Sequence, residues 1–147
     1  MAFHVLRQLR DNVKTALAGL ATTGANVFVN RSEDEPLQDS ELPALRIYLR
    51  ISDAAVNEIG IKRTYVRTAD LEIQACVKKI ATFEDDVYQI LKEVEIAMNA
   101  GGIGAKRADI KQVHIEDDAK GEKPVAVGHF TFELEFYTQV GSPDAFQ

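Results

Sequence analysis

Residues 130–137 read Phe-Thr-Phe-Glu-Leu-Glu-Phe-Tyr, and this stretch decides the fold class. Apolar side chains stand at every second position, with mostly polar ones between them. Because successive side chains of a strand point to opposite faces of a sheet, the pattern predicts a strand with one buried and one exposed face. Antiparallel sheets commonly bury one face and expose the other. The stretch therefore favours an antiparallel sheet that is covered on one side.

Two further stretches alternate in the same way, at residues 45–52 and 70–77. The connection between them, residues 54–62, is short and polar, whereas a parallel return needs a longer crossover. We therefore expect an antiparallel hairpin here, which can project as an arm. Shorter strands are expected at residues 27–29 and around 110–115.

Two segments show the three- and four-residue spacing of an amphipathic helix, residues 3–20 and 83–98. The apolar stripe of the second helix, centred on Leu91 and Val94, is expected to pack on the apolar face of the sheet.

Between residues 31 and 43 lies an acidic segment without periodicity, which we expect to form an unpacked loop. The sequence thus predicts an α+β fold in the order α-β-β-β-α-β-β, with a mostly antiparallel sheet covered on one face by two amphipathic helices. We expect a single domain over residues 1–147, with a loose C-terminal tail after about residue 140.

The composition excludes several classes of protein. The net charge of −6 gives the chain no reason to seek phosphate backbones, so no specific nucleic acid is expected as a partner. A single cysteine rules out an internal disulfide framework. No apolar run approaches the length of about 20 residues that a membrane-spanning helix needs, so no membrane association is expected.

The residues that most often carry chemistry do not form a recognisable site. The histidines His4, His114 and His129 fall on different predicted elements, and none belongs to a metal-binding motif. Cys76 lies on a strand without a family signature for a nucleophile around it. We therefore predict no catalytic residue, no metal and no cofactor, and expect the chain not to be an enzyme.

One resemblance goes beyond fold class. The acidic loop leads into Leu-Pro-Ala-Leu-Arg-Ile-Tyr-Leu at residues 42–49, a second alternating strand runs directly into a helix, and the chain closes on residues 130–137. In these stretches and in its order of elements the chain resembles the tail terminator proteins of long-tailed bacteriophages, the lambda minor tail protein U type. The resemblance covers most of the chain.

The resemblance implies a hexameric ring that caps the tail tube, ends its elongation and presents a surface to the head. Its partners would then be further copies of the chain, the tail tube protein and a head-completion or neck protein, with DNA passing through the ring. The protein would be assembled in the bacterial cytoplasm and end in the tail of the virion. Alternatives are another neck or tail-completion ring, a generic binding module and a small enzyme.

A ring needs two different patches that meet between neighbouring subunits. The acidic loop and the hairpin carry opposite charges and are the best candidates in the sequence. A solvated role for both loops is the alternative. The expected interface residues are Glu33, Asp34 and Glu35 in the loop and Lys62, Arg63 and Arg67 in the hairpin.

Overall fold

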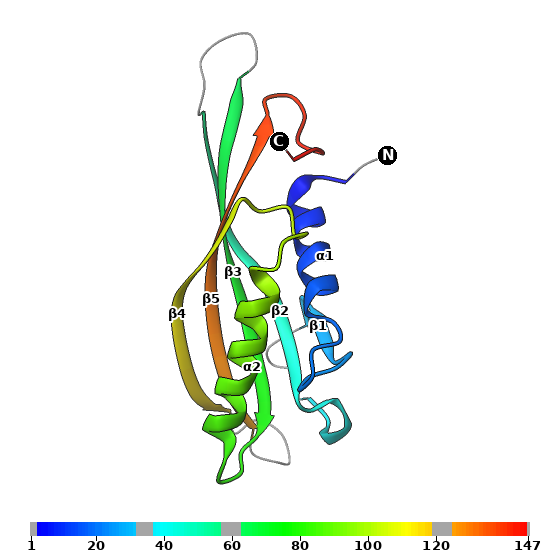
Figure 1. Ribbon diagram of the computed structural model, residues 1–147, viewed down its shortest axis with the longest axis vertical. Helices are drawn as coiled ribbons and strands as arrows, with labels where there is room; N and C mark the ends of the chain where they lie inside the picture. Colours follow the sequence, from blue (N-terminus) through cyan, green and yellow to red (C-terminus); the bar gives the residue numbers. More distant parts are fainter. Residues whose placement is uncertain (1–2, 32–36, 57–62, 119–124, 147) are drawn as a thin grey trace.

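The computed structural model describes residues 3–31, 37–56, 63–118 and 125–146. Its fold is α+β, and its helices and strands follow the predicted chain order (Figure 1). A short 3-10 turn precedes the second strand at Asp39–Glu41. The elements are α1 (Val5–Leu17), β1 (Val27–Val29), β2 (Ala44–Val56), β3 (Thr64–Lys78), α2 (Phe83–Met98), β4 (Arg107–Asp118) and β5 (Val125–Gln139).

The five strands form one sheet in the spatial order β1-β2-β3-β5-β4. Only β1 and β2 are parallel, and the other neighbours are antiparallel. The spatial order differs from the order along the chain, because β5 lies between β3 and β4. Burial accounts for this placement: Phe130, Phe132 and Phe136 of β5 are fully buried, whereas Ile110 and Val113 of β4 are exposed. The most apolar strand thus takes a central position and β4 takes an edge.

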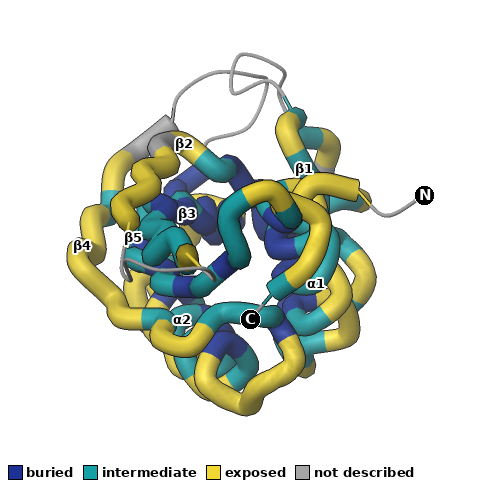
Figure 2. The backbone as a smooth tube through the Cα atoms, turned by 90° about the horizontal axis from the view of Figure 1, so that it is seen from above, coloured by how far each residue is buried: buried dark blue, intermediate teal, exposed yellow. Residues whose placement is uncertain are grey.

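Both helices lie on the same face of the sheet, α1 beside β1 and β2 and α2 over β3 and β5 (Figures 1 and 2). The predicted stripe of α2 packs there as expected: Val94 is fully buried and Leu91 packs at the edge of the same core. Gly128 of β5 allows this close approach, because a Cβ atom at Gly128 would lie 2.6 Å from Cγ1 of Val87. The main core joins α1, α2 and the inner face of the sheet, with Leu9, Leu17, Ile47, Leu71, Ile73, Ile90, Phe132 and Leu134 among its fully buried members.

The alternation predicted for residues 45–52 is interrupted. Leu49 pairs with Leu71, but Ile51 pairs with Asp70, so the register shifts by one residue at Arg50. Such a bulge inserts one residue into one strand and increases its local twist. A similar shift occurs in β4 between Ile110 and Gln112.

The C-terminal tail is packed, which corrects the prediction of a loose tail after about residue 140. The Phe146 ring meets the buried Phe136 edge-on, with 5.8 Å between ring centroids. The Val5 amide donates to the Pro143 carbonyl at 2.7 Å, at the start of α1. The tail is therefore held by one aromatic contact and by one hydrogen bond. This hydrogen bond also satisfies a backbone N–H group in the first turn of α1, which has no partner within the helix.

Candidate interaction site

The hairpin of β2 and β3 extends beyond both helices as an arm (Figure 1). Its strands are paired from Asp53 opposite Thr68 to Val56 opposite Tyr65, and β5 accompanies β3 as far as Thr64. We call residues 53–67 the arm; its tip, residues 57–62, lies outside the described residues. Residues 53–56 are all exposed, so this side of the arm adds nothing to the core.

The three basic residues predicted for the arm differ in their surroundings. Arg63 is exposed, and its backbone carbonyl accepts a hydrogen bond from the Val140 amide at 2.8 Å. Arg67 instead donates from Nε to Thr138 Oγ1 at 2.9 Å and lies over the Tyr65 ring. Arg67 therefore braces the arm against β5. Lys62 lies outside the described residues.

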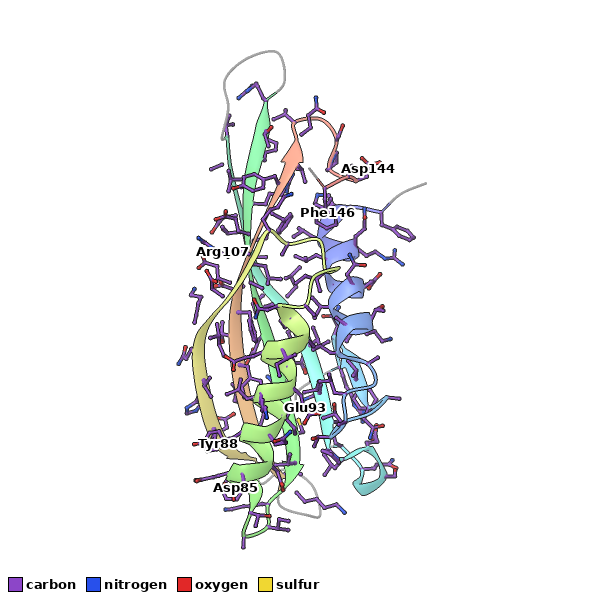
Figure 3. All side chains as sticks on the ribbon, in the orientation of Figure 1. Asp85, Tyr88, Glu93, Arg107, Asp144 and Phe146 are labelled. Carbon is purple, nitrogen blue, oxygen red and sulfur yellow. The ribbon has the colours of Figure 1, made fainter. Side chains whose placement is uncertain are left out.

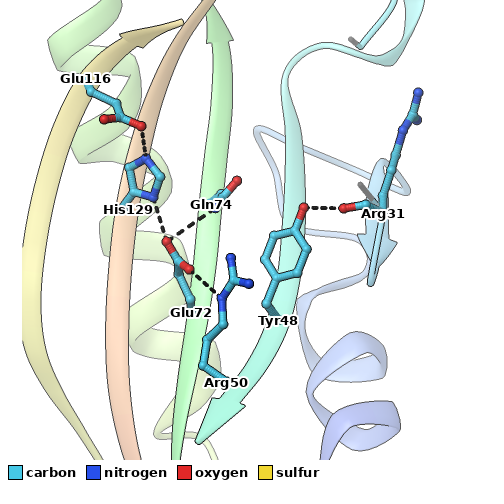
Figure 4. Close-up of polar contacts among 7 residues, drawn as sticks. All are labelled: Arg31, Tyr48, Arg50, Glu72, Gln74, Glu116 and His129. Atoms are coloured by element: carbon cyan, nitrogen blue, oxygen red, sulfur yellow. Dashed lines mark hydrogen bonds and ion pairs between the residues drawn. The ribbon is translucent and has the colours of Figure 1, made fainter. Parts of the chain in front are cut away.

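The acidic residues Glu33, Asp34 and Glu35 also lie outside the described residues. The flanks of their loop are packed, which corrects the expectation of an unpacked segment. Arg31 and Glu41 form an ion pair that draws these flanks together, and the Tyr48 hydroxyl donates to the Arg31 carbonyl (Figure 4). Hydrogen bonds from the Arg31 guanidinium and the Gln38 amide lower the pKa of Glu41 below its ordinary value.

A small apolar cluster explains the rest of this packing. Leu37 and Leu42 contact a second core formed by Cys76, Val125 and Val127 on the face of the sheet away from the helices. Cys76 is fully buried there, so its thiol is a packing group. In the sequence, only the presence of Leu37 and Leu42 within the acidic segment indicated that this segment contacts the sheet.

The outer face of the sheet carries a polar network centred on Glu72 (Figure 4). Its carboxylate accepts from Arg50 Nε at 2.9 Å and from Gln74 Nε2 at 3.3 Å, and lies 2.6 Å from His129 Nδ1. His129 Nε2 lies 2.7 Å from a Glu116 carboxylate oxygen. The network links β2, β3, β5 and β4, and we infer that it stabilises their pairing.

This network lowers the pKa of Glu72. Burial raises the pKa of Glu72, but hydrogen bonds from His129, Arg50 and Gln74 outweigh it, so the pKa lies below its ordinary value of 4.5. A lowered native pKa stabilises the fold above the unfolded-state pKa, and this contribution is lost as the pH falls through the native pKa.

We expect Glu72→Gln to lower the free energy of unfolding by about 1–3 kcal/mol at pH 7, because it removes the carboxylate to which the charged Arg50 guanidinium donates. The difference in free energy of unfolding between this variant and the unchanged protein should shrink as the pH falls below about 4.5. Below this pH Glu72 of the unfolded chain becomes protonated, and at lower pH the native carboxylate follows. Urea unfolding at several pH values measures this difference in free energy. Glu84→Gln, which changes an exposed glutamate, is the control. An equal deficit at every pH would contradict the assignment.

A pocket of about 290 Å³ lies at the other end of the molecule. We call it the Ile80 pocket, since Ile80 lies on its rim with 55% of its surface exposed. The first turn of α2, beside the pocket, carries Glu84, Asp85 and Asp86 (Figure 3 labels Asp85). The pocket is lined by Thr22, Leu42, Pro43, Val77, Lys78, Ile80 and Asp86.

The pocket was not foreseen from the sequence, because its wall comes from four separate segments. Thr22 follows α1, Leu42 and Pro43 precede β2, residues 77–80 run from the end of β3 into the link after it, and Asp86 lies in the first turn of α2. The bond between Leu42 and Pro43 is cis. An exposed isoleucine just before an acidic helix start was the one signal available.

In the ranges that the structure describes, no three His, Cys, Asp or Glu side chains gather in a way that would hold a metal ion. No helix among the described residues is long and apolar enough to cross a membrane. A search with protein-family models found no match to the chain, and a search of curated proteins found none either.

Proposed function

We propose that the chain is a structural assembly protein of a long-tailed phage or phage-like particle. In this proposal it forms a ring, a homo-hexamer, that caps the tail tube, ends its elongation and provides the surface that joins the head. Its partners are the tail tube protein and a head-completion or neck protein. It acts by covering the growing end of the tube, and no residue serves as a catalyst or a cofactor ligand.

The arm is the observation that carries this proposal. Residues 53–56 are exposed on a paired hairpin that reaches beyond both helices. An exposed strand segment that contributes no core side chains is typical of a segment that contacts a partner. The resemblance in residues 42–49 and 130–137 supplies the kind of partner. Residues 44–49 of the first stretch lie in β2, and the second stretch lies in β5.

A different ring of the neck, or a tail-completion ring, is the second candidate. The same arm supports it, because any ring needs contacts between unlike patches of neighbouring subunits. The two candidate functions differ in the structure to which the ring binds, and electron microscopy can show whether that structure is the end of a tail tube.

Purified protein should be added to tail tube protein, encoded by the same genome, while that protein polymerises. We expect tubes to stop growing and to carry one ring at an end in electron micrographs. Tubes that grow to the same length with and without the protein, and that carry no ring, would contradict the proposal. Rings that bind only to head portals would favour the second candidate.

A further inference from the structure

We propose that copies of the chain join through the two open edges of the sheet, so that β4 of one copy pairs with β2 of the next. The first surface, the β4 edge, is residues 107–116, and the second, the β2 edge, is residues 49–56. Both lie within the residues that the structure describes. The inference rests on the self-association that the proposed function requires, and it names the two surfaces that meet.

The described sheet ends in two strands with unpaired backbone groups. β4 is the last strand in the spatial order and pairs with β5 alone. At the other end, β1 pairs with β2 only from Leu45 to Ile47, so the β2 edge has β3 as its one described neighbour. A row of unpaired N–H and C=O groups is a template for pairing with another chain. The chain thus presents two templates, one at each end of the sheet.

The β4 edge carries apolar side chains that its own chain leaves uncovered. Ile110 and Val113 lie opposite Phe132 and Phe130, and so share the helix-side face of the sheet with them. Both phenylalanines are fully buried, whereas Ile110 is 37% and Val113 is 41% exposed. The reason is that α2 packs on β3 and β5, inward of this edge (Figure 1). A strand added beside β4 would remove this apolar surface from water.

The β2 edge presents small and apolar side chains on the same face. Val56 lies opposite Tyr65, and Tyr65 lies opposite Thr138, two positions after the buried Phe136. Opposite residues share a face of the sheet, so Val56 and Ala54 both point to the helix-side face. Both residues are exposed. The two edges therefore match in the face on which their apolar side chains stand.

One antiparallel register satisfies both edges. With Val56 beside Ile110, the bulge after Ile110 brings Ala54 beside Val113, so these side chains meet on one face. In this register the stretch of β2 that β1 occupies lies beyond the end of β4, so β1 does not obstruct the contact. The open part of β2 is thus the part that the β4 edge receives.

The direction of the strands suits a ring. Three antiparallel steps separate β2 from β4 in the sheet, so the two strands run in opposite directions. Antiparallel pairing between copies therefore lets every copy point the same way. Such a contact joins unlike patches, which closes into a ring or continues as a filament. The strands would then be tilted relative to the ring axis, as they are in β-barrels.

Cross-linking tests the contact directly. Two variants are prepared, Ala54→Cys and Val113→Cys, both at exposed positions, while the native Cys76 is fully buried. When the two are mixed and oxidised, we expect cross-linked dimers that contain one copy of each. The control replaces the second variant with Ile96→Cys, which is 62% exposed on α2 and lies outside both edges. We expect little cross-linking with this control.

A charge placed on the β4 edge supplies a second readout. Val113→Lys is expected to weaken self-association about tenfold in sedimentation experiments, equivalent to about 1.4 kcal/mol, because it sets a charge against the apolar side chains of the neighbouring strand. Ile96→Lys removes an exposed isoleucine from α2 and is the matched control, which should change nothing.

Hydrogen exchange distinguishes backbone pairing from a contact between side chains alone. Amides that form new hydrogen bonds between copies exchange more slowly, because exchange then requires the contact to open. We expect slower exchange in rings than in monomers within residues 107–116 and within residues 49–56.

Preferential cross-linking of Ala54→Cys with Val113→Cys, together with slower exchange at both edges, supports the inference. Rings that form while this pair cross-links no better than the Ile96→Cys control would overturn it and leave the proposed function intact. Dimers of Val113→Cys with itself, in place of the mixed pair, would also overturn it, because β4 would then pair with β4. A chain that never self-associates, with or without tail tubes, would overturn both the inference and the proposed function.

Discussion

Phe132→Ala is expected to lower the free energy of unfolding by about 3–5 kcal/mol, the largest loss of stability that we predict for a single substitution. Phe132 is fully buried on β5, the strand between β3 and β4. Its ring packs in the core formed by the inner face of the sheet and both helices. Truncation removes apolar contacts and leaves a cavity that the surrounding strands cannot fill without moving.

Urea unfolding followed by circular dichroism measures this loss. Phe3→Ala removes the same group from a side chain that is 53% exposed and is the matched control. We expect the control to cost less than about 1 kcal/mol, as is usual for surface substitutions. Similar losses for both variants would mean that the centre of the core is misassigned.

Shortening the arm is expected to abolish ring formation while the body of the protein remains folded. Residues 55–66 can be replaced by Asn-Gly, because Ala54 and Arg67 lie directly opposite each other and a two-residue turn can join them. The deletion removes the exposed strand ends and the tip together. It spares the central pairing from Leu45 with Ala75 to Leu49 with Leu71.

Sedimentation and the melting temperature together measure this result. We expect monomers at concentrations at which the full-length protein forms rings, and a melting transition that stays cooperative. A variant of unchanged arm length, with Ala54→Ser at an exposed position, is the control and should still assemble. Normal rings without the arm would show that it is not part of the subunit interface.

The sequence was most informative where one pattern continued over many residues. The phenylalanines between residues 130 and 136 predicted β5, because strict alternation over this length is typical of a half-buried strand. The stripe of α2 was equally clear, and Val94 packs where it was expected. In both cases the period of the pattern matches the geometry of the element, which local sequence determines.

Features that depend on distant residues could not be predicted in this way. The placement of β5 between β3 and β4 depends on which strand gains most from burial, a comparison across the whole chain. The bulge at Arg50 depends on its partner strand. His129 and Glu72 are 57 positions apart, so their contact appears only once the sheet is formed.

The candidate interface was predicted only in part. The arm follows from two long strands with a short connection, and the structure places Arg63 at its exposed end. Arg67, also expected at the interface, donates to Thr138 of β5 and lies over the Tyr65 ring, and its contact with a neighbouring copy stays a prediction. The Ile80 pocket was missed because residues from four segments form it, and no single stretch reveals their proximity.

Electron microscopy of tail tubes grown with the protein tests the central proposal most directly. We expect one ring at the end of each tube, with six copies of the chain by native mass spectrometry, and tubes that stop elongating once it is bound. Bare tube ends, or single copies scattered along the tube wall, would contradict the account.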